Sequence, residues 1–279
     1  MRVKIVTDST CDLPRKVAEE LGITVIPVNV HFGDEVYKDG VELSTDEFYR
    51  KLQTNSVLPK TSVPSPGIFR EVYQMLASKS DAIVSIHVAA AMSATCEAAR
   101  LGAAELKHPI SIVDSQTASM ACGLLAVIAA RAAREGASLA DIEVLLKDAI
   151  PRTITYGVFS TMEYLYKGGR IGRAQAFLGN ILKISPVLAI RRGEILPIAR
   201  VRTRPKAINR LCGIIEGLGT LKEMSVMQTT NPDEAEALAQ RLASVFPQER
   251  MLRATLGPAM GTYVGPDAVG VALIAEKPL

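Results

Sequence analysis

Tryptophan is absent from this sequence, and aromatic residues make up only 5% of its 279 residues. Because 48% of the residues are hydrophobic, the cores must be built mainly from aliphatic side chains. Long apolar runs are also missing. The longest, residues 120–130, is followed by Arg131 and is too short to cross a bilayer, so we expect a buried helix there. These features indicate a globular protein that is long enough for two domains.

Cysteine is scarce and the charges of the two signs nearly balance. The four cysteines show neither a CxxC pair nor metal-ligand spacing, which predicts reduced thiols and no metal site. The net charge is only +3, and no basic run is interleaved with aromatic residues, so nucleic acid is not an expected partner. Residues 1–6 enter a strand without a signal-peptide apolar region, and we therefore expect a cytoplasmic protein.

The first half of the chain repeats one pattern, a buried strand followed by a polar loop and a helix. This pattern recurs after the strands expected at residues 3–7, 82–88 and 110–113. It predicts an α/β fold with a parallel sheet that carries helices on both faces. A further strand is expected at residues 23–30, where Pro27 favours a place at the sheet edge. Residues 31–38 look like a hairpin, and Asp12 can cap a helix that ends at Gly22.

The pattern changes after Pro151. A hairpin around residues 191–194 and strands near residues 224–229, 251–256 and 269–275 predict a mixed α/β arrangement. We therefore expect an N-terminal α/β domain over residues 1–153 and a C-terminal mixed α/β domain over residues 154–279.

Several hydroxyl groups stand in the loops that should meet at the carboxyl edge of the parallel sheet. Ser93 follows a strand, where it can cap the next helix or help to bind an anion, and both roles remain open. Thr61 and Ser62 precede a helix that Ser65 is placed to cap, so capping does not explain them. Flanking prolines would hold these two hydroxyls in an extended presentation, although ordinary turn chemistry explains them equally well.

Common catalytic patterns are missing. Only three histidines exist, and none has a GxSxG nucleophile motif near it. The GxGxxG and GxxxxGK[ST] nucleotide motifs are absent, and no cluster of residues has metal-ligand spacing. What remains is a set of hydroxyls, helix N-termini and glycine-rich turns that can bind an anion without reacting with it.

The order and spacing of these segments resemble the DegV family, whose members bind fatty acids and partner a fatty acid kinase. The segments that carry the resemblance are residues 6–9, 61–66, 92–95, 113–115, 167–171, 184–188 and 257–266. The resemblance implies that a long-chain fatty acid lies non-covalently between the two domains, with no other cofactor. It also implies that the carboxylate is presented to a separate, dihydroxyacetone-kinase-like fatty acid kinase subunit, which forms the acyl phosphate.

The resemblance further assigns the site that holds the carboxylate. The family's threonine and serine ligands correspond to Thr61 and Ser93, with Ser62 and Ala94 beside them. Ala94 stands where the family has glycine, so a positive φ there would be costly. Tyr263 stands where the family has histidine, and a phenol can donate a hydrogen bond but supplies no cation near neutral pH.

The remaining expectations concern the tail, the partner and two alternatives. The tail should be lined by Ile184, Val187, Leu188 and Met260, each of which could equally be ordinary core. Arg170 and Arg202 are candidates for docking the kinase, although most arginines of this half should simply face solvent. A transient contact with a membrane surface is also possible. The alternatives are a hydrolase or transferase that uses Ser93 as nucleophile on an acylated or phosphorylated small molecule, and a lipid-responsive regulator without a kinase.

Overall fold

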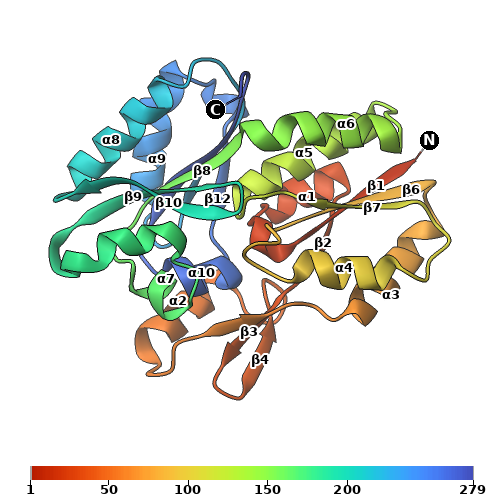
Figure 1. Cartoon of the computed structure of the whole chain (residues 1–279), viewed down its shortest axis with the longest axis horizontal. Coiled ribbons are helices and arrows are strands. Elements are labelled where there is room, and N and C mark those ends of the chain that lie inside the picture. The colour runs from red at the N-terminus through yellow and green to blue at the C-terminus, as the bar shows by residue number, and fades with distance from the viewer. Residues whose placement is uncertain (1, 279) are drawn as a thin grey trace.

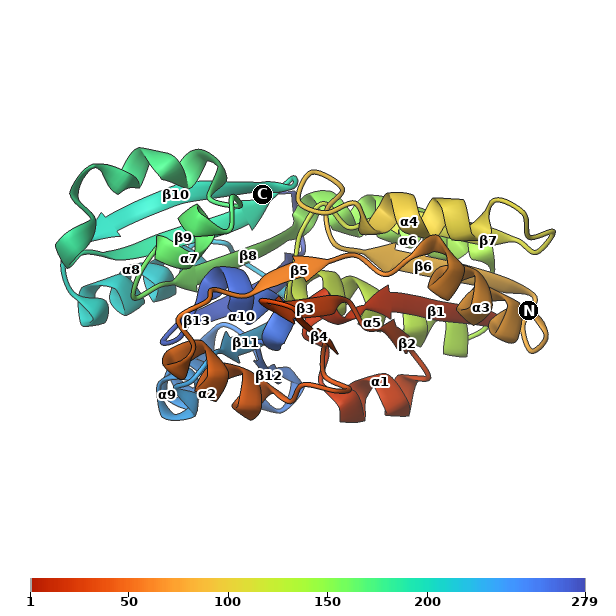
Figure 2. The same cartoon turned by 90° about the horizontal axis from the view of Figure 1, so that it is seen from below.

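The computed structural model describes residues 2–278, with side chains for all of them except residues 178–183. Two large sheets lie side by side and a small third sheet covers one end of the seam between them (Figures 1 and 2). No helix in the described part of the chain is long and apolar enough to span a membrane. All four cysteines are free and buried, which confirms the expected reduced thiols.

The N-terminal sheet has four parallel strands in the order β2-β1-β6-β7. Their bounds are β1 Val3–Asp8, β2 Thr24–Ile26, β6 Ala82–His87 and β7 Ile110–Asp114. One face is covered by α3 (Pro66–Ala77) and α4 (Thr95–Ala103). The other is covered by α1 (Arg15–Leu21), α5 (Met120–Arg134) and α6 (Leu139–Ala149). The predicted parallel sheet with helices on both faces is confirmed.

Alternation along the strands explains why both faces are apolar. On β6, Ile83 packs toward α3 and α4, whereas Val84 and Ile86 pack toward α5 and α6. A strand that is buried on both sides must be apolar at successive positions, which is the run that the sequence shows here.

The C-terminal sheet has six strands in the order β10-β9-β8-β13-β11-β12, and only the pair β11 and β12 is parallel. Its strands are β8 Thr153–Val158, β9 Ser185–Arg191, β10 Glu194–Val201, β11 Leu221–Gln228, β12 Leu252–Thr255 and β13 Val269–Ala275. Helices α8 (Arg204–Glu216) and α9 (Pro232–Arg241) cover one face. This is the predicted mixed α/β arrangement.

Helix α5 joins the two sheets into one continuous core. Leu124 and Leu125 of this helix share a cluster with Val84 of the N-terminal sheet and with Ala272 and Ile274 of the C-terminal sheet. The buried helix predicted for residues 120–130 is therefore confirmed, and it lies at the seam between the sheets (Figure 1).

The third sheet has the order β4-β3-β5 and is antiparallel. It comprises β3 Asn29–Phe32, β4 Glu35–Lys38 and β5 Lys60–Ser62, with α2 (Thr45–Thr54) packed against it. The single strand expected over residues 23–30 is wrong, because the chain leaves the first sheet after Ile26 and enters this one at Asn29. Pro27 lies in the gap, where it has no ladder bond to donate. The edge position of β2 and the hairpin of β3 and β4 are as predicted.

Neither Asp12 nor Ser93, which were considered as helix caps, is the N-cap of a helix. Pro14, not Asp12, precedes α1, although this helix does end at Gly22 in the left-handed conformation. Helix α4 begins at Thr95 after Ala94, so Ser93 lies one residue too early to be its cap. Both displaced residues have other partners, described below.

The remaining elements bring the second half of the chain back to the seam. They are α7 (Glu163–Lys167), a 3₁₀ helix (Gly172–Lys183) and α10 (Pro258–Val264). Short 3₁₀ turns lie at Ser9–Cys11, Ile150–Arg152, Leu242–Ser244 and Gln248–Arg250. Helix α10 contacts both α7 and the small third sheet, so segments from the two ends of the chain meet there (Figure 2).

Candidate ligand-binding cavity

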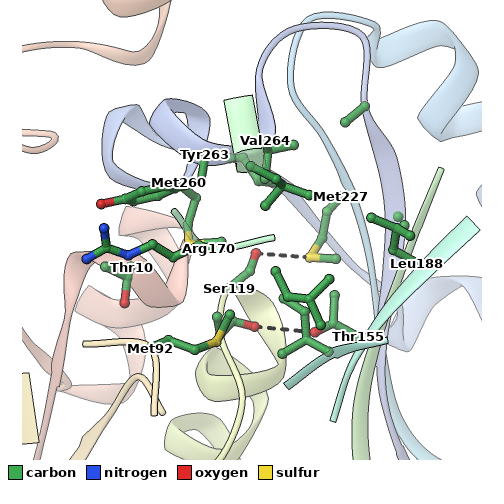
Figure 3. Close-up of a pocket in the computed structure, with 18 of the residues that line it drawn as sticks. Thr10, Met92, Ser119, Thr155, Arg170, Leu188, Met227, Met260, Tyr263 and Val264 are labelled. Carbon is green, nitrogen blue, oxygen red and sulfur yellow. Dashed lines mark hydrogen bonds between the residues drawn. The ribbon is translucent and has the colours of Figure 1, made fainter. Parts of the chain in front are cut away.

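A cavity of about 990 Å³, counting space open to solvent at its mouth, lies between the two large sheets. Both halves of the chain contribute to its wall, through the loops after β1, β6 and β7 and through β8, β9, β11 and α10 (Figure 3). A ligand in this cavity would therefore be held by both sheets at once.

Most of the cavity wall is aliphatic or thioether. Leu188, Met227, Met260 and Val264 line it, together with Val88, Leu165, Ile190 and Ile195. Such a wall offers no hydrogen bonds to water, so an apolar chain is its natural occupant. The methionines can adjust to the shape of a flexible chain, because the thioether side chain is unbranched and polarizable.

Polar groups gather at one end of this cavity. The hydroxyl of Thr61, on β5, lies 2.6 Å from the phenol oxygen of Tyr263, on α10. The guanidinium of Arg170 lies 5.0 Å from the centre of the Tyr263 ring, in a cation–π contact. Arg170, Tyr263 and Thr10 lie toward the same end of the cavity, away from Leu188 (Figure 3). The cavity thus has an apolar body and a hydrogen-bonding, cationic end.

Gly168 permits the tyrosine to take this position. A Cβ atom at residue 168 would lie 2.6 Å from the ring of Tyr263, which is closer than packed carbon atoms can come. The glycine-rich turn after α7 is therefore required by the close approach of the ring.

Ser93 lines the cavity too and is not the N-cap of α4. Its hydroxyl lies 2.8 Å from that of Thr95 and accepts the Thr95 N–H at 3.3 Å. The partners of Ser93 are thus a hydroxyl and an amide, neither of which can act as a base. Ala94 is exposed and has φ −77°, so the alanine causes no backbone strain.

Strand alternation decides which of the other predicted residues reach the cavity. Ser62 follows Thr61 on β5 and points away, where its hydroxyl lies 2.8 Å from His31 Nε2 and 3.2 Å from Asn29 Nδ2. Val187 precedes Leu188 on β9 and for the same reason packs into the core on the far side of that sheet. Both residues were expected at the ligand, and the structure places neither among the lining residues.

Of the other predicted residues, some line the cavity and some do not. Leu188 and Met260 lie on the wall, whereas Ile184 packs beside it against the cluster that contains Leu165. Arg170 is at the polar end of the cavity. Arg202 is exposed in the turn between β10 and α8 and does not line the cavity.

Four polar lining residues, Thr10, Ser119, Thr155 and Tyr156, were missed by the sequence reasoning. Thr10 donates its hydroxyl to Asp8, and Ser119 donates its own to Asp12 Oδ2 at 2.6 Å. Thr10 lies in the loop after β1 and Ser119 in the loop after β7, and both loops were expected to meet at this edge of the sheet. The loops were therefore chosen correctly, but the residue within each loop depends on a turn geometry that has no sequence signal.

Asp8 begins a buried chain of side-chain hydrogen bonds. His87 Nδ1 lies 2.8 Å from Asp8 Oδ2, His87 Nε2 lies 2.7 Å from Ser85 Oγ, and that oxygen accepts from the Tyr73 hydroxyl at 2.8 Å. Burial acts to raise the pKa of Asp8, but the hydrogen bond and charge of His87 outweigh it and hold this pKa below its usual value.

This order of atoms resembles a Ser-His-Asp catalytic triad, yet the serine is not accessible. Ser85 and His87 are fully buried and are not among the residues that line the cavity. The chain instead ties β1 to β6 and fixes Asp8, which accepts the hydroxyl of Thr10.

Two further buried carboxyls, those of Asp12 and Asp39, lie under the start of α10. Asp12 Oδ1 accepts the Gly257 N–H at 2.8 Å, which links the N-terminal half to the C-terminal half. Burial raises the pKa of Asp12 well above its usual value and raises that of Asp39 to about 6. Within the described residues, no group of three or more histidine, cysteine or acidic side chains is placed to hold a metal ion.

Fold and cavity together define an α/β protein with a largely apolar cavity between its two large sheets, which ends in a cluster of hydroxyls and a guanidinium. A family model described as "Uncharacterised protein, DegV family" matches residues 2–276. The chain belongs to the DegV family.

Relatives of known sequence and structure agree with this assignment. A DegV domain-containing protein of Streptomyces coelicolor is 37% identical over 273 residues, covering 96% of this chain and 97% of its own. A DegV family protein of Thermus thermophilus, described by its fatty acid binding, superimposes with a TM-score of 0.92 at 32% identity, covering 99% of this chain and all of its own. DegV of Bacillus subtilis, described as a fatty acid binding protein, has a TM-score of 0.89 at 29% identity over 99% of this chain and all of its own.

Proposed function

We propose that this protein binds one long-chain fatty acid non-covalently, with the acyl tail in the apolar cavity and the carboxylate at its polar end. The observation that carries this proposal is the change in polarity along one cavity wall. Leu188, Met227 and Val264 line its apolar part. Thr61, Arg170 and Tyr263 line its polar end. Relatives that share this fold are described as fatty acid binding proteins.

The acyl tail and the carboxylate contribute differently to the free energy of binding. Each buried methylene contributes about 0.8 kcal/mol, so a long tail contributes on the order of 10 kcal/mol before the cost of association is subtracted. Hydrogen bonds to a charged carboxylate add about 1.5–3 kcal/mol each. The tail therefore supplies most of the affinity, and the hydroxyls of Thr61, Ser93 and Tyr263 supply the orientation.

Holding the carboxylate in a fixed orientation matters if a second protein reacts with it. We propose that a separate, dihydroxyacetone-kinase-like fatty acid kinase receives it. In that step a carboxylate oxygen attacks the terminal phosphorus of ATP, the acyl–O–P bond forms and ADP leaves. Arg170 is exposed at the polar end of the cavity and is suited to this encounter. Arg202 would contribute to a wider docking surface only, because it lies away from the cavity.

The binding proposal is tested by titrating palmitate against a fluorescent fatty acid bound to the purified protein. We expect displacement by one palmitate per chain, and weaker displacement by hexadecane of similar length in the same vehicle, because the hydrocarbon lacks the hydrogen bonds of the carboxylate. The presentation step is tested separately, by adding such a kinase and ATP and trapping acyl phosphate with hydroxylamine. Loss of hydroxamate formation in the Arg170→Ala protein, with palmitate affinity retained within a few-fold, is the expected result. Unchanged hydroxamate formation would remove Arg170 from the docking surface.

A further inference from the structure

Three hydroxyl groups of the cavity wall, those of Thr10, Ser119 and Thr155, have their hydrogens engaged by acceptors of the protein itself. Thr10 donates to the carboxylate of Asp8, and Thr155 donates to the backbone oxygen of Ala118 at 3.3 Å. A hydroxyl has one hydrogen and two lone pairs, so what it still offers after donating is an acceptor. Thr10 and Thr155 can therefore accept a hydrogen bond from a ligand but cannot donate one.

The hydrogen of Ser119 is engaged in either protonation state of Asp12. When Asp12 is ionised, Ser119 donates to Asp12 Oδ2, 2.6 Å away. Burial raises the pKa of Asp12 well above its usual value, and a protonated Asp12 donates to Ser119 instead. The serine then turns its hydrogen to the sulfur of Met227, at 3.3 Å (Figure 3). In both states Ser119 keeps a lone pair for a ligand and no hydrogen.

Hydrogen-bond donors and acceptors are therefore separated along the cavity. Arg170, at the polar end, can only donate. Ser119 and Thr155 lie between that end and Leu188, and each has its bond to the protein drawn in Figure 3. Their free lone pairs repel a carboxylate and gain nothing from methylene groups. A hydroxyl group on the chain is the ligand group that can donate to them.

We propose that the cavity accepts a fatty acid with a hydroxyl group near the middle of its chain, which donates to Ser119 Oγ or Thr155 Oγ1. This inference rests on the proposed fatty acid binding and specifies the class of tail. A hydroxyl that enters an apolar cavity without a partner loses its hydrogen bonds to water, which weakens binding. Ser119 and Thr155 replace that water, so a hydroxylated chain binds about as well as a plain one.

Competition titrations against a fluorescent fatty acid, with stearate, 10-hydroxystearate and 18-hydroxystearate as competitors, test this inference. The native protein should bind 10-hydroxystearate within about threefold of stearate, because one hydrogen bond replaces another. It should bind 18-hydroxystearate at least about tenfold more weakly than stearate. The hydroxyl of that acid lies beyond Ser119 and Thr155, against apolar side chains such as Leu188.

Variants then assign the effect to the two residues. Thr155→Val and Ser119→Ala should each lower the ratio of 10-hydroxystearate affinity to stearate affinity by at least about threefold, and together by at least about tenfold. Melting temperatures are measured alongside, because Ser119→Ala removes a partner of Asp12, whereas Thr155→Val does not. Thr153→Val is the matched control. Thr153 is also buried on β8 and donates to a backbone oxygen, that of Ala149 at 2.9 Å, but it does not line the cavity. This control should keep the native ratio.

Three outcomes contradict the inference. One is native binding of 10-hydroxystearate at least tenfold weaker than that of stearate. Another is equal binding of 10-hydroxystearate and 18-hydroxystearate, which would show that the position of the hydroxyl does not matter. The third is a native ratio in the folded Thr155→Val and Ser119→Ala proteins, which would show that neither residue accepts from the ligand. A native protein that does not bind stearate would contradict the proposed function instead, so the two failures are distinguishable.

Discussion

The hydroxyls of Thr61 and Tyr263 lie 2.6 Å apart although 202 residues separate them in the chain. One comes from a three-residue strand in the first quarter of the sequence and the other from a short helix near its end. This contact brings the two halves together at the polar end of the cavity. It also leaves each hydroxyl able to turn toward a ligand, because a carboxylate oxygen can accept from both.

Removing the hydroxyl of Thr61 should weaken fatty acid binding without unfolding the protein. Thr61→Val keeps the shape of the side chain but removes a donor to a charged group, a loss of about 1.5–3 kcal/mol or roughly tenfold or more in affinity. Ser93→Ala should act in the same direction. Ser62→Ala is the matched control, since its hydroxyl points to His31 and Asn29 and should not affect affinity. If the Thr61→Val/Ser93→Ala protein binds as the native one does, neither hydroxyl is at the carboxylate.

The phenol at position 263 should make affinity nearly independent of pH between about 6 and 8, since histidines titrate in this range and phenols do not. Tyr263→His should introduce a slope, with tighter binding on the acid side, where the imidazolium attracts the carboxylate. Tyr263→Phe provides the control, with weaker but still flat binding. Fluorescent fatty acid titrations across this range would measure all three proteins. A histidine-like slope in the native protein would mean that another group holds the carboxylate.

The two buried methionines of β11 lie on opposite faces of the sheet, one at the cavity and one in the core. Met227 lines the cavity, whereas Met224 packs on the opposite face of the same strand. Truncation of either to alanine should cost about 2–5 kcal/mol of stability. Only Met227→Ala should also lower the affinity for palmitate, by about tenfold, because it removes apolar contact with the tail. Thermal melts and displacement titrations of both variants would measure this difference. Equal affinities would place the tail elsewhere.

Asp39 should make the protein less stable as the pH rises through about 6. Burial raises its pKa from 3.8 to about 6, so the folded state binds a proton more tightly than the unfolded state does. The resulting stabilisation is complete below about pH 4 and is lost as the pH rises through the folded pKa. At about 1.4 kcal/mol for each pH unit, it amounts to about 3 kcal/mol.

Replacing Asp39 by asparagine should reduce this pH dependence. Chemical denaturation at pH 5 and pH 7.5 should show a smaller fall in the free energy of unfolding for Asp39→Asn than for the native protein. Asp34→Asn, at an exposed position in the turn between β3 and β4, should keep the native dependence. The same fall in all three proteins would show that Asp39 does not carry the effect.

The hydrophobic pattern of the sequence was sufficient to predict the two large sheets. Residues 82–87, for example, are apolar except for Ser85 and His87 and are buried at every position, which in an α/β pattern means burial on both faces of a parallel sheet. The third sheet was not predicted as such. Strand β5 is only three residues long and pairs with β3, about thirty residues earlier. Neither its length nor a nearby turn therefore indicates a strand in the sequence.

The site was predictable at the level of loops and less so at the level of side chains. Val187 and Leu188 are equally apolar, and only the register of β9 decides that Leu188 reaches the cavity. Ser119 was missed because its φ of 56°, unusual for serine, belongs to a turn that the sequence does not specify. Resemblance to the family supplied Thr61 and Ser93, whose placement on the cavity wall depends on contacts between distant segments.

The most direct test of fatty acid binding is mass spectrometry of the protein as purified from cells. A largely apolar cavity in a cell that contains acyl chains should seldom be empty. We predict a native mass that exceeds the denatured mass by one C14–C18 fatty acid, with that acid recovered in the organic extract. A native mass equal to the mass of the chain alone, after purification and after incubation with palmitate, would contradict fatty acid binding. A mass increase that survives denaturation would instead indicate a covalent adduct.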